Sequence, residues 1–517
     1  MTYDAIVVGS GFGGAVVACR LAEKGCKVLV FERGRHWNID KNFHPDDWFF
    51  DHNDPVEHNG WFDFRVFGRM STVAGAGVGG GSLHYANTSI DAPKDAFDAG
   101  WPHAINHREL APYYNRVKDM LSSAPIPARQ EPEKLKLLRN AAMALGYEQW
   151  FSKVDLAITF NEELDYDSRQ PPPSPDAVVF KKNVHGVDQG SCIHLGECVL
   201  GCRVRARNML DYNYLAEARN NKAEIRPLHL VRSIRPATAG YAVEYEEITE
   251  TGLKAGSEHA KLVVVSAGSI GTTELLLRCR DEHKSLPGLG PMVGKHWCSN
   301  TNYLTLADHA NFDVYPTRGP SITGAVEFFG DQAHLGAGVN IEDGGIPPTI
   351  VPFSGGRGFG GSGLLAELHK TLGADGLFRH KMPWFSQGRD ESTGEFSLRK
   401  QWVLFGKRVL HLSWDPAAAD KPMKAIIDLH ERMAKATGGD PPPSLWPLLR
   451  ALVTPHPLGG CVMADDPAQG VVNHRGEVFA YPGLYIADGS IIPRAIGLNP
   501  SKTIAALAER IAEGIKC

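Results

Sequence analysis

The first 34 residues hold the pattern that most restricts how this chain can fold. An apolar run at residues 3–8 leads into Gly9-Ser-Gly-Phe-Gly-Gly14, which matches G-x-G-x-x-G, and residues 15–24 then have the composition of a helix. A second apolar run, residues 27–31, ends at Glu32. The first glycine permits a tight turn, the second lets the backbone approach a pyrophosphate, and the third lets the helix pack closely on the strand.

The order of these features predicts a βαβ unit that binds a dinucleotide. Free N–H groups and the macrodipole at the helix N-terminus favour the negative charge of a pyrophosphate. Glu32 can accept hydrogen bonds from an adenosine ribose. FAD and NAD are both bound in this way, so the unit alone leaves the choice between them open.

A second glycine-rich segment favours FAD. Residues 75–82 read Gly-Ala-Gly-Val-Gly-Gly-Gly-Ser, and such a run is unfavourable in a helix or strand because each glycine lowers its stability. A flexible surface linker is one interpretation. The apolar residues Val78 and Leu83 favour another, in which the backbone approaches a large flat ligand closely.

Blocks at both ends of the chain carry a family resemblance. They are the loop at 75–83, the strand-and-turn segment at 261–274, and the C-terminal segments at 456–461 (His-Pro-Leu-Gly-Gly-Cys), 482–490 and 497–501. Together they resemble the glucose-methanol-choline (GMC) oxidoreductases, and the C-terminal segments are similar to those of the cholesterol-oxidase branch.

The resemblance implies an α/β fold with two domains. The first is a Rossmann-like FAD-binding domain, and the second is a discontinuous substrate domain of α+β type with a sheet and helices. The expected FAD-binding domain covers residues 1–40, 65–100, 200–300 and 455–517, and the substrate domain covers residues 101–199 and 301–454.

Local patterns add expectations within this frame. Alternating apolar and polar residues between positions 224 and 248 predict an antiparallel meander. Helices are expected at residues 108–121, 133–145 and 503–515. The glycine-dense segment at 353–363 contains two aromatic residues, and a mobile lid and a plain surface loop are both compatible with it.

The glycine motifs and the resemblance together give a set of expected FAD contacts. Asp488 matches the family aspartate near the ribityl-phosphate, and the helix after Asn499 can point its N-terminus at the flavin. The expected cofactor-binding residues are Gly9, Gly11, Phe12, Gly13, Gly14, Glu32, Gly77, Gly79, Gly80, Gly81, Ser82, Ala267, Asp488, Gly489, Asn499 and Pro500.

Oxidation of an alcohol by a flavin needs a proton acceptor and a polar group that orients the hydroxyl. His456 is the candidate acceptor, because histidine changes its protonation most easily near neutral pH. Asn499 is the candidate orienting group, since the resemblance places this His–Asn pair at matching positions. Residues 339–348 resemble the cholesterol-oxidase strand whose glutamate moves a proton along the sterol ring, which makes Glu342 the candidate for that role, with Glu327 as a second choice. A solvated strand-end acid explains Glu342 equally well.

Three cysteines lie close together in the sequence, at Cys192, Cys198 and Cys202. Their C-x5-C-x3-C spacing does not match a zinc site, which prefers paired cysteines and four ligands. It is similar to the segment of FAD-dependent glucose dehydrogenases that holds a 3Fe-4S cluster. Buried thiols without a metal are the other interpretation.

The net charge of −5, without basic clusters, argues against a nucleic-acid partner. We expect no integral membrane segment, no signal peptide, a cytoplasmic location and mostly reduced cysteines. The expected partners are a small-molecule alcohol and, as electron acceptor, dioxygen or a carrier protein.

The favoured activity is FAD-dependent oxidation of a bulky hydrophobic or sterol-like secondary alcohol. An iron–sulfur dehydrogenase of a sugar or polyol, and a FAD-containing lyase, are the alternatives.

Overall fold

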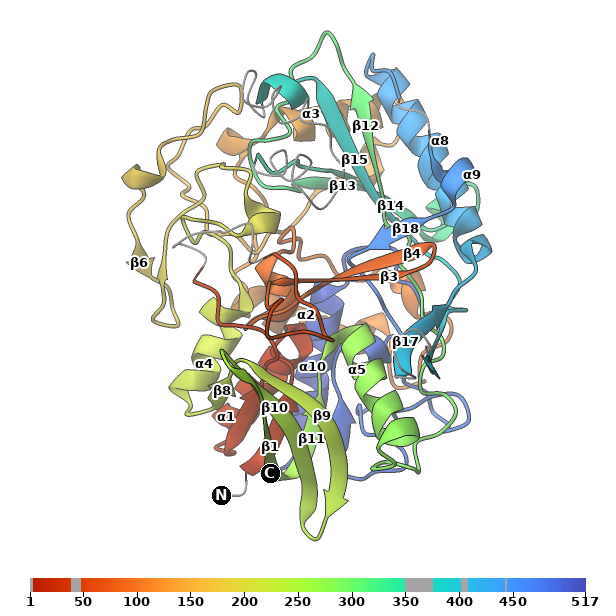
Figure 1. The fold of residues 1–517 in the computed structure, drawn as a ribbon. Helices are drawn as coiled ribbons and strands as arrows, with labels where there is room; N and C mark the ends of the chain where they lie inside the picture. The colour runs from red at the N-terminus through yellow and green to blue at the C-terminus, as the bar shows by residue number, and fades with distance from the viewer. Residues whose placement is uncertain (1–2, 39–47, 349–374, 401–407, 442–443) are drawn as a thin grey trace.

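The computed structural model describes residues 3–38, 48–348, 375–400, 408–441 and 444–517. Its two largest sheets lie in the lower and upper halves of the molecule in Figure 1. The glycine-dense segment at 353–363 lies outside the described residues.

The lower sheet contains the predicted βαβ unit. Its central strand β1 (Tyr3–Val8) runs parallel to β2 (Val28–Phe31) on one side and to the end of β11 (Gly252–Val265) on the other. β8 (Glu224–Arg226) extends the sheet beyond β2, and β19 (Leu484–Ile486) runs parallel to β11. Parallel strands covered on both faces need apolar residues throughout, which explains the uninterrupted apolar runs of β1 and β2.

The predicted antiparallel meander extends this sheet. β9 (His229–Ala237) pairs with β10 (Gly240–Thr249), which in turn pairs with β11. The main strand order is β8-β2-β1-β11-β10-β9, so the crossover connections place the parallel strands next to the meander. This arrangement confirms the expected α/β fold with a Rossmann-like domain.

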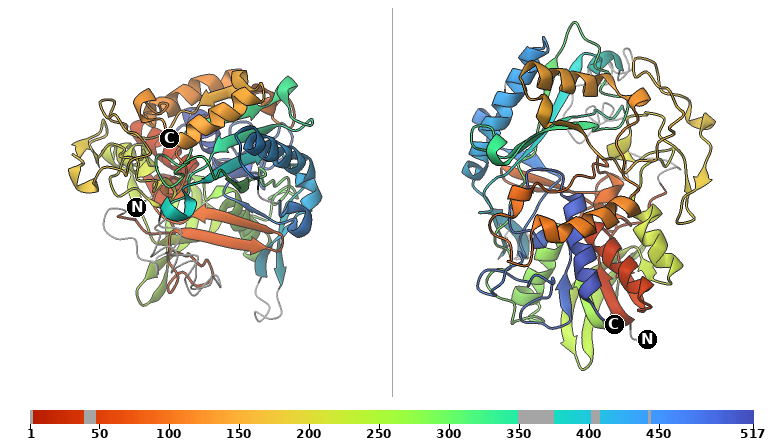
Figure 2. Two further views of the ribbon diagram at one scale, coloured as in Figure 1. Left: turned by 90° about the horizontal axis from the view of Figure 1, so that it is seen from above. Right: turned by 180° about the vertical axis from the view of Figure 1, so that it is seen from behind.

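Helices cover the parallel strands. α1 (Phe12–Glu23) begins inside the glycine motif and contacts both α4 (Tyr214–Asn220) and α10 (Ser501–Gly514). α2 (His107–Met120) packs on α10, so these helices lie side by side in the view from behind in Figure 2. α5 (Gly268–Leu277) follows β11. The helices expected at 108–121 and 503–515 are therefore present, with ends shifted by one or two residues.

The upper sheet is antiparallel and carries helices on one face. α3 (Glu133–Ala144) and α8 (Asp420–Ala436) contact each other and share a buried apolar cluster with the strands. Its strands, in spatial order, are β12 (Tyr303–Asp308), β15 (Lys381–Gly388), β14 (Val339–Asp343), β13 (Gly324–Phe328) and β5 (Phe151–Lys153).

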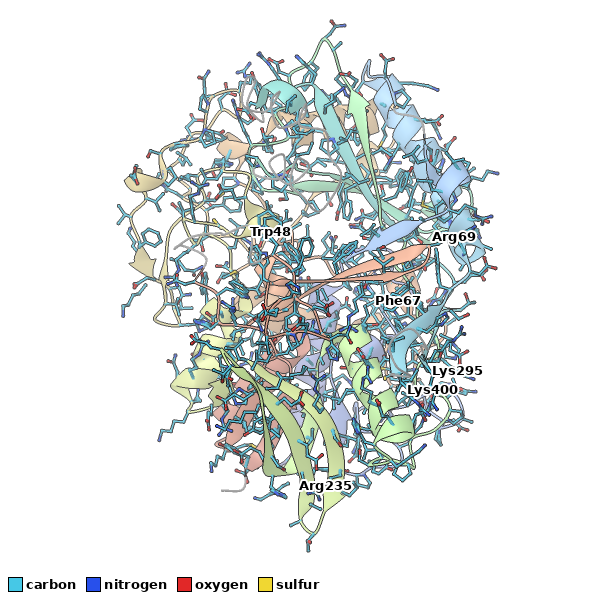
Figure 3. The ribbon with its side chains drawn as sticks, in the orientation of Figure 1. Trp48, Phe67, Arg69, Arg235, Lys295 and Lys400 are labelled. Atoms are coloured by element: carbon cyan, nitrogen blue, oxygen red, sulfur yellow. A yellow bond between two sulfur atoms is a disulfide. The ribbon has the colours of Figure 1, made fainter. Side chains whose placement is uncertain are left out.

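A three-stranded sheet lies between the two halves. β18 (Leu452–Thr454) runs parallel to β4 (Met70–Gly75), which pairs with β3 (Phe62–Phe67) in an antiparallel hairpin. Figure 3 shows Trp48 above this hairpin, between the two large sheets. The remaining elements are two small hairpins, β6 (Lys181–Lys182) with β7 (Asp188–Gln189) and β16 (Glu395–Lys400) with β17 (Arg408–Ser413), and the short helix α9 (Trp446–Leu449).

The C-terminus is tied to the first βαβ unit. A disulfide joins Cys26, which follows α1, to Cys517, with their Cα atoms 5.9 Å apart. The chain ends lie side by side in Figure 1. Seven other cysteines are thiols, which agrees with the expectation that most are reduced. Among the described residues, no helix is both long and apolar enough to cross a membrane.

We predict that loss of this disulfide lowers the melting temperature. The bond closes a very long loop and so restricts the unfolded chain, an effect typically of about 2–4 kcal/mol. Calorimetry of the Cys517→Ser variant and of the wild type in dithiothreitol should give the same, lower Tm. An unchanged Tm of the wild type in dithiothreitol would contradict this role.

Candidate active site

The glycine motif at the start of α1 combines close packing with open space. A Cβ atom on Gly13 would lie 1.5 Å from the carbonyl oxygen of Ala487, and one on Gly14 would lie 1.9 Å from a carbonyl oxygen of the preceding turn. Only glycine fits at these two positions. A Cβ on Gly11 would meet nothing nearer than a Cα atom of Gly80 at 3.9 Å. Gly11 therefore leaves space that the protein itself does not fill.

A cavity of about 740 Å³ opens at this turn and continues towards the upper sheet. Its volume lies in the range of cofactor and ligand sites. Segments from both ends of the chain and from its middle form its wall. The lining includes the predicted cofactor-binding residues Gly9, Gly11, Phe12, Gly13, Glu32, Gly80, Gly81, Ala267, Asp488, Gly489, Asn499 and Pro500, and also His456.

Four predicted cofactor-binding residues shape the wall without lining it: Gly14, Gly77, Gly79 and Ser82. The Ser82 hydroxyl donates to the carbonyl of Gly79 over 2.8 Å and accepts from the amide of Leu210 over 3.2 Å. Gly79 has a φ of 99°, which only glycine adopts readily. Gly79 and Ser82 thus fix the bend of the second glycine loop, residues 75–82.

Arg207 holds this loop from behind, a role that the sequence did not reveal. Its side chain is buried, and its guanidinium donates to the carbonyls of Ser82 at 2.6 Å and Leu83 at 2.7 Å. A third bond, of 3.0 Å, reaches the side-chain oxygen of Asn87. A buried cation that is bonded to several oxygens fixes their positions, since loss of any partner would expose the charge to an apolar interior.

Glu32 lies at the end of β2, as expected, and is fixed by the glycine turn. One carboxylate oxygen accepts from the amide and hydroxyl of Ser10 at 3.1 and 2.6 Å, and the other accepts from the amide of Gly34 at 3.0 Å. The carboxylate is part of the cavity wall. Its position suits recognition of a ribose next to a pyrophosphate.

Asp488 joins the C-terminal segment to the start of α5. One of its oxygens accepts from the Gly268 amide at 2.9 Å and from the hydroxyl of Thr272, and the other accepts from the amide of Ser490 at 2.8 Å. Burial raises the pKa of Asp488, although these hydrogen bonds lower it. The aspartate therefore brings two distant parts of the chain to one wall of the cavity.

His456 and Asn499 line the same cavity. Burial lowers the pKa of His456 to about 3, so its imidazole is neutral at pH 7. Its ring packs against Phe385, with centroids 6.4 Å apart. Within the described part of the chain, Nδ1 of His456 and Oδ1 of Asn499 are buried without a hydrogen-bond partner. Buried polar atoms without a partner are rare unless a ligand or a water molecule forms the missing hydrogen bond.

Glu342 lies on β14 behind this wall and is fully buried. Burial raises its pKa to about 8, although hydrogen bonds from Gln387, Asn340 and Asn499 oppose the shift. The amides of Gln387 and Asn340 each donate to the carboxyl over 3.0 Å. Glu342 is thus a buried acid beside Asn499, not a solvated strand end, but neither it nor Glu327 on β13 is part of the cavity lining.

A buried charge cluster lines the other end of the cavity. Arg65 contacts both Asp63 at 2.9 Å and Glu274 at 2.5 Å, and Arg33 contacts Asp63 at 2.7 Å. The nearby arginines hold the pKa of both carboxyls well below the usual range despite burial. Sequence reasoning missed this cluster because its members come from separate segments. It also missed His84, although this lining residue directly follows the glycine loop.

The three cysteines at 192, 198 and 202 do not support the predicted iron–sulfur cluster. In the part of the chain that the structure describes, no group of three or more His, Cys, Asp or Glu side chains could hold a metal ion. Cys192 and Cys198 lie in an apolar cluster. Burial raises the pKa of Cys192 well above its usual value and that of Cys202 to about 11, which favours thiols over metal-binding thiolates.

The cavity fits a flavin dinucleotide. Gly11 leaves a space beside the N-terminus of α1, and Glu32 lies at the end of the next strand. Several buried polar atoms that line the cavity have no partner among the described residues, including Nε2 of His84, Oγ of Ser321, Nδ1 of His456 and Oδ1 of Asn499. These features suit a bound group with a pyrophosphate at one end and a polar-edged ring at the other.

Known proteins share these sequence features. Two models described as GMC oxidoreductase match residues 178–298 and 391–508, and a model of an NAD(P)-binding Rossmann-like domain matches residues 7–52. A cholesterol oxidase from Acinetobacter baumannii is 28% identical, over 98% of this chain and 93% of its own. A cholesterol oxidase from Mycobacterium tuberculosis is 29% identical, over 99% and 90%. The crystal structure of a pyridoxine 4-oxidase has the same fold, with a TM-score of 0.62, 16% identity and 99% coverage of both chains.

We predict that alanine at two glycines of the α1 motif has two different effects, one on folding and one on FAD binding. Gly13→Ala should lower the free energy of unfolding by about 1–3 kcal/mol or more, because its Cβ would collide with backbone. Gly11→Ala should keep the Tm of the protein without FAD but weaken FAD binding, because its Cβ would project into the cavity. Thermal unfolding and fluorescence titration with FAD measure the two effects. Equal Tm values and equal FAD affinities for both variants would contradict the assignment.

Glu342 should make stability depend on pH. Its pKa of about 8 in the folded state exceeds the ordinary value of 4.5, so the folded protein keeps a proton that the unfolded chain releases. Stability should therefore fall as the pH rises from about 4.5 to 8, with a slope approaching about 1.4 kcal/mol per pH unit. Denaturant unfolding of Glu342→Gln should show a shallower fall over this window. Parallel profiles would contradict the raised pKa.

Proposed function

Because the chain belongs to the GMC oxidoreductase family and is therefore an alcohol oxidoreductase, we propose that it uses FAD to oxidise a bulky, hydrophobic secondary alcohol such as a sterol. The observation that carries this proposal is one continuous cavity, which runs from the dinucleotide turn to His456 and Asn499. The names of the cholesterol oxidases that match almost the whole chain support the same substrate class.

Several apolar side chains line the cavity, which supports a hydrophobic substrate. Phe385 on β15 packs near the imidazole, so a ring system could be held next to the reacting hydroxyl. These apolar side chains come from the short helical turn Cys198–Leu200, from the segment just before β13, and from the upper and middle sheets. They are Val199, Leu200, Leu304, Ile322, Phe385 and Val453.

FAD, when bound, supplies a hydride acceptor at flavin N5. His456 is the proposed acceptor of the hydroxyl proton. Its low pKa keeps the imidazole neutral, so a ring nitrogen offers a lone pair to the hydroxyl. The proton transfer becomes favourable as the alcohol carbon loses its hydride, because the hydroxyl is then much more acidic.

Asn499 is the proposed orienting residue for the hydroxyl or for the flavin edge. The single hydroxyl proton goes to His456, so the unpartnered Oδ1 of Asn499 is free to accept a hydrogen bond from the flavin edge. Glu342 is the proposed group for moving a proton along a sterol ring. Its pKa of about 8 makes both forms accessible near neutral pH, so the carboxylate can take a proton from one ring carbon and the protonated carboxyl can return it to another. The electron acceptor that we propose is dioxygen or a carrier protein.

An anaerobic alcohol panel tests this function. Sterols should bleach the absorbance of the bound flavin faster than long-chain alcohols or sugars do, and the purified protein should contain no stoichiometric iron. Substrate turnover without bleaching would instead indicate a lyase. Purified protein that is colourless and does not take up FAD would exclude the proposal.

His456→Ala should lower the rate of flavin reduction about 10²–10⁴-fold, the usual contribution of a positioned acid or base. FAD content should not change. His309→Ala is a matched control, because His309 is also buried and its pKa is also lowered by burial, but it does not line the cavity. Stopped-flow reduction of both variants gives the comparison, and equal rates would exclude His456 from the chemistry.

A further inference from the structure

One short segment, Ser299–Asn302, connects the two halves of the molecule. Just before it, Cys298 exchanges backbone hydrogen bonds with Leu458 in the C-terminal block, at 3.0 and 3.1 Å. Just after it, β12 begins at Tyr303 in the upper sheet. All four residues of the segment are buried. The segment therefore lies where the C-terminal block meets the upper sheet.

Asn300 holds the backbone immediately before Asn499. Its amide nitrogen donates to the carbonyl of Leu498 over 2.8 Å, and its amide oxygen accepts from the N–H of Gly497, also over 2.8 Å. A planar amide that pairs with both groups fixes the position and the direction of this loop. Since Asn499 is the next residue, its side chain is directed by the same contact.

The neighbouring residues hold His456 in a similar way. The Thr454 hydroxyl donates to the carbonyl of Ser299 over 2.6 Å, accepts from the amide of Asn302 over 2.9 Å and accepts from the backbone N–H of His456 over 2.9 Å. The hydroxyl therefore donates one hydrogen bond and accepts two, which is all that it can form. The loops that carry His456 and Asn499 are attached to one segment.

The backbone of this segment is in an unfavourable conformation. Asn300 has a φ of 56° and Thr301 a φ of 25°, which is unusual for a residue branched at Cβ. Asp390 stabilises the bend, because its buried carboxylate accepts from both the amide and the hydroxyl of Ser299 at 2.8 Å. Strained conformations persist where surrounding contacts determine them, and they concentrate at functional sites.

We propose that Asn300 is a positioning residue that sets the place of Asn499 relative to His456, and so controls the rate of alcohol oxidation. This inference rests on the proposed function. Asn300 does not line the cavity, and it acts through the backbone of Gly497 and Leu498. Small displacements of catalytic groups are costly, and about 1 Å can reduce a rate about 100-fold.

Asn300→Gly tests the proposal. Glycine accepts the positive φ, so the change removes the amide contacts without adding backbone strain. We expect kcat and the anaerobic rate of flavin reduction to fall about 10–100-fold. KM should change less than about threefold, because the apolar cavity wall is untouched. A structural role alone would lower the Tm without this split between kcat and KM.

Asn213→Gly is the matched control. Asn213 is also buried, and its amide also joins backbone groups: it donates to the carbonyl of Met209 over 2.9 Å and accepts from the N–H of Tyr214 over 2.7 Å. It contacts neither the His456 loop nor the Asn499 loop. Asn213→Gly should lower the Tm as Asn300→Gly does, but keep kcat within about twofold.

If Asn300→Gly does not fold, Asn300→Asp provides a second test, because its carboxyl keeps the acceptor for the Gly497 N–H but turns an oxygen, not a donor, towards the Leu498 carbonyl. Unchanged kcat in either folded variant, together with a large loss in His456→Ala, would overturn the positioning role alone. Unchanged kcat in His456→Ala as well would exclude His456 from the chemistry, and so overturn the part of the proposed function on which this inference rests. An equal loss of kcat in Asn213→Gly would also contradict the inference.

Discussion

The structure depends on one close crossing of backbone, between the first turn of α1 and the end of β19. Gly13 is so close to the carbonyl of Ala487 that no side chain fits between them. β19 reaches this place because it pairs in parallel with the end of β11, on the opposite edge from β1. Asp488 then joins the same segment to α5. The segment around Ala487 is therefore fixed against the start of α1, and the cavity forms where they meet.

Burial shifts the pKa values of the two titratable candidates for the reaction, His456 and Glu342, in opposite directions. It lowers the pKa of His456 to about 3 and raises that of Glu342 to about 8, so both are neutral at pH 7. A neutral imidazole can accept a proton and a neutral carboxyl can donate one. The apolar side chains in the cavity wall, Phe385 among them, are also suited to an alcohol that carries a large hydrophobic body.

Much of the fold follows from local sequence. The βαβ unit was predictable because Gly13, Gly14 and the apolar runs around them satisfy a single packing geometry, and the observed elements differ from the expected ones only at their ends. The C-terminal contacts were predictable only through the family resemblance. The expected domain boundaries and the roles of His456 and Asn499 remain predictions.

The contacts that the sequence did not reveal involve residues far apart in the chain. Nothing in the local pattern around Arg207, Asp63 or Asn300 shows which backbone groups these side chains meet. The same limit explains the cysteine segment, where spacing suggested a cluster but the surroundings are apolar and the thiols have raised pKa values. The spacing of cysteines in the sequence shows which thiols could bind one metal site. Whether those thiols are deprotonated, as metal binding requires, depends on their surroundings in the folded protein.

The central claim is that both ends of the chain build one flavin site faced by His456 and Asn499. A crystal structure of the protein loaded with FAD measures this most directly. The pyrophosphate should lie at the Gly9–Gly14 turn, and the side chains of His456 and Asn499 should contact one face or edge of the flavin ring. A flavin ring with His456 on the far side of the protein wall, or a cavity that stays empty with saturating FAD, would contradict this claim.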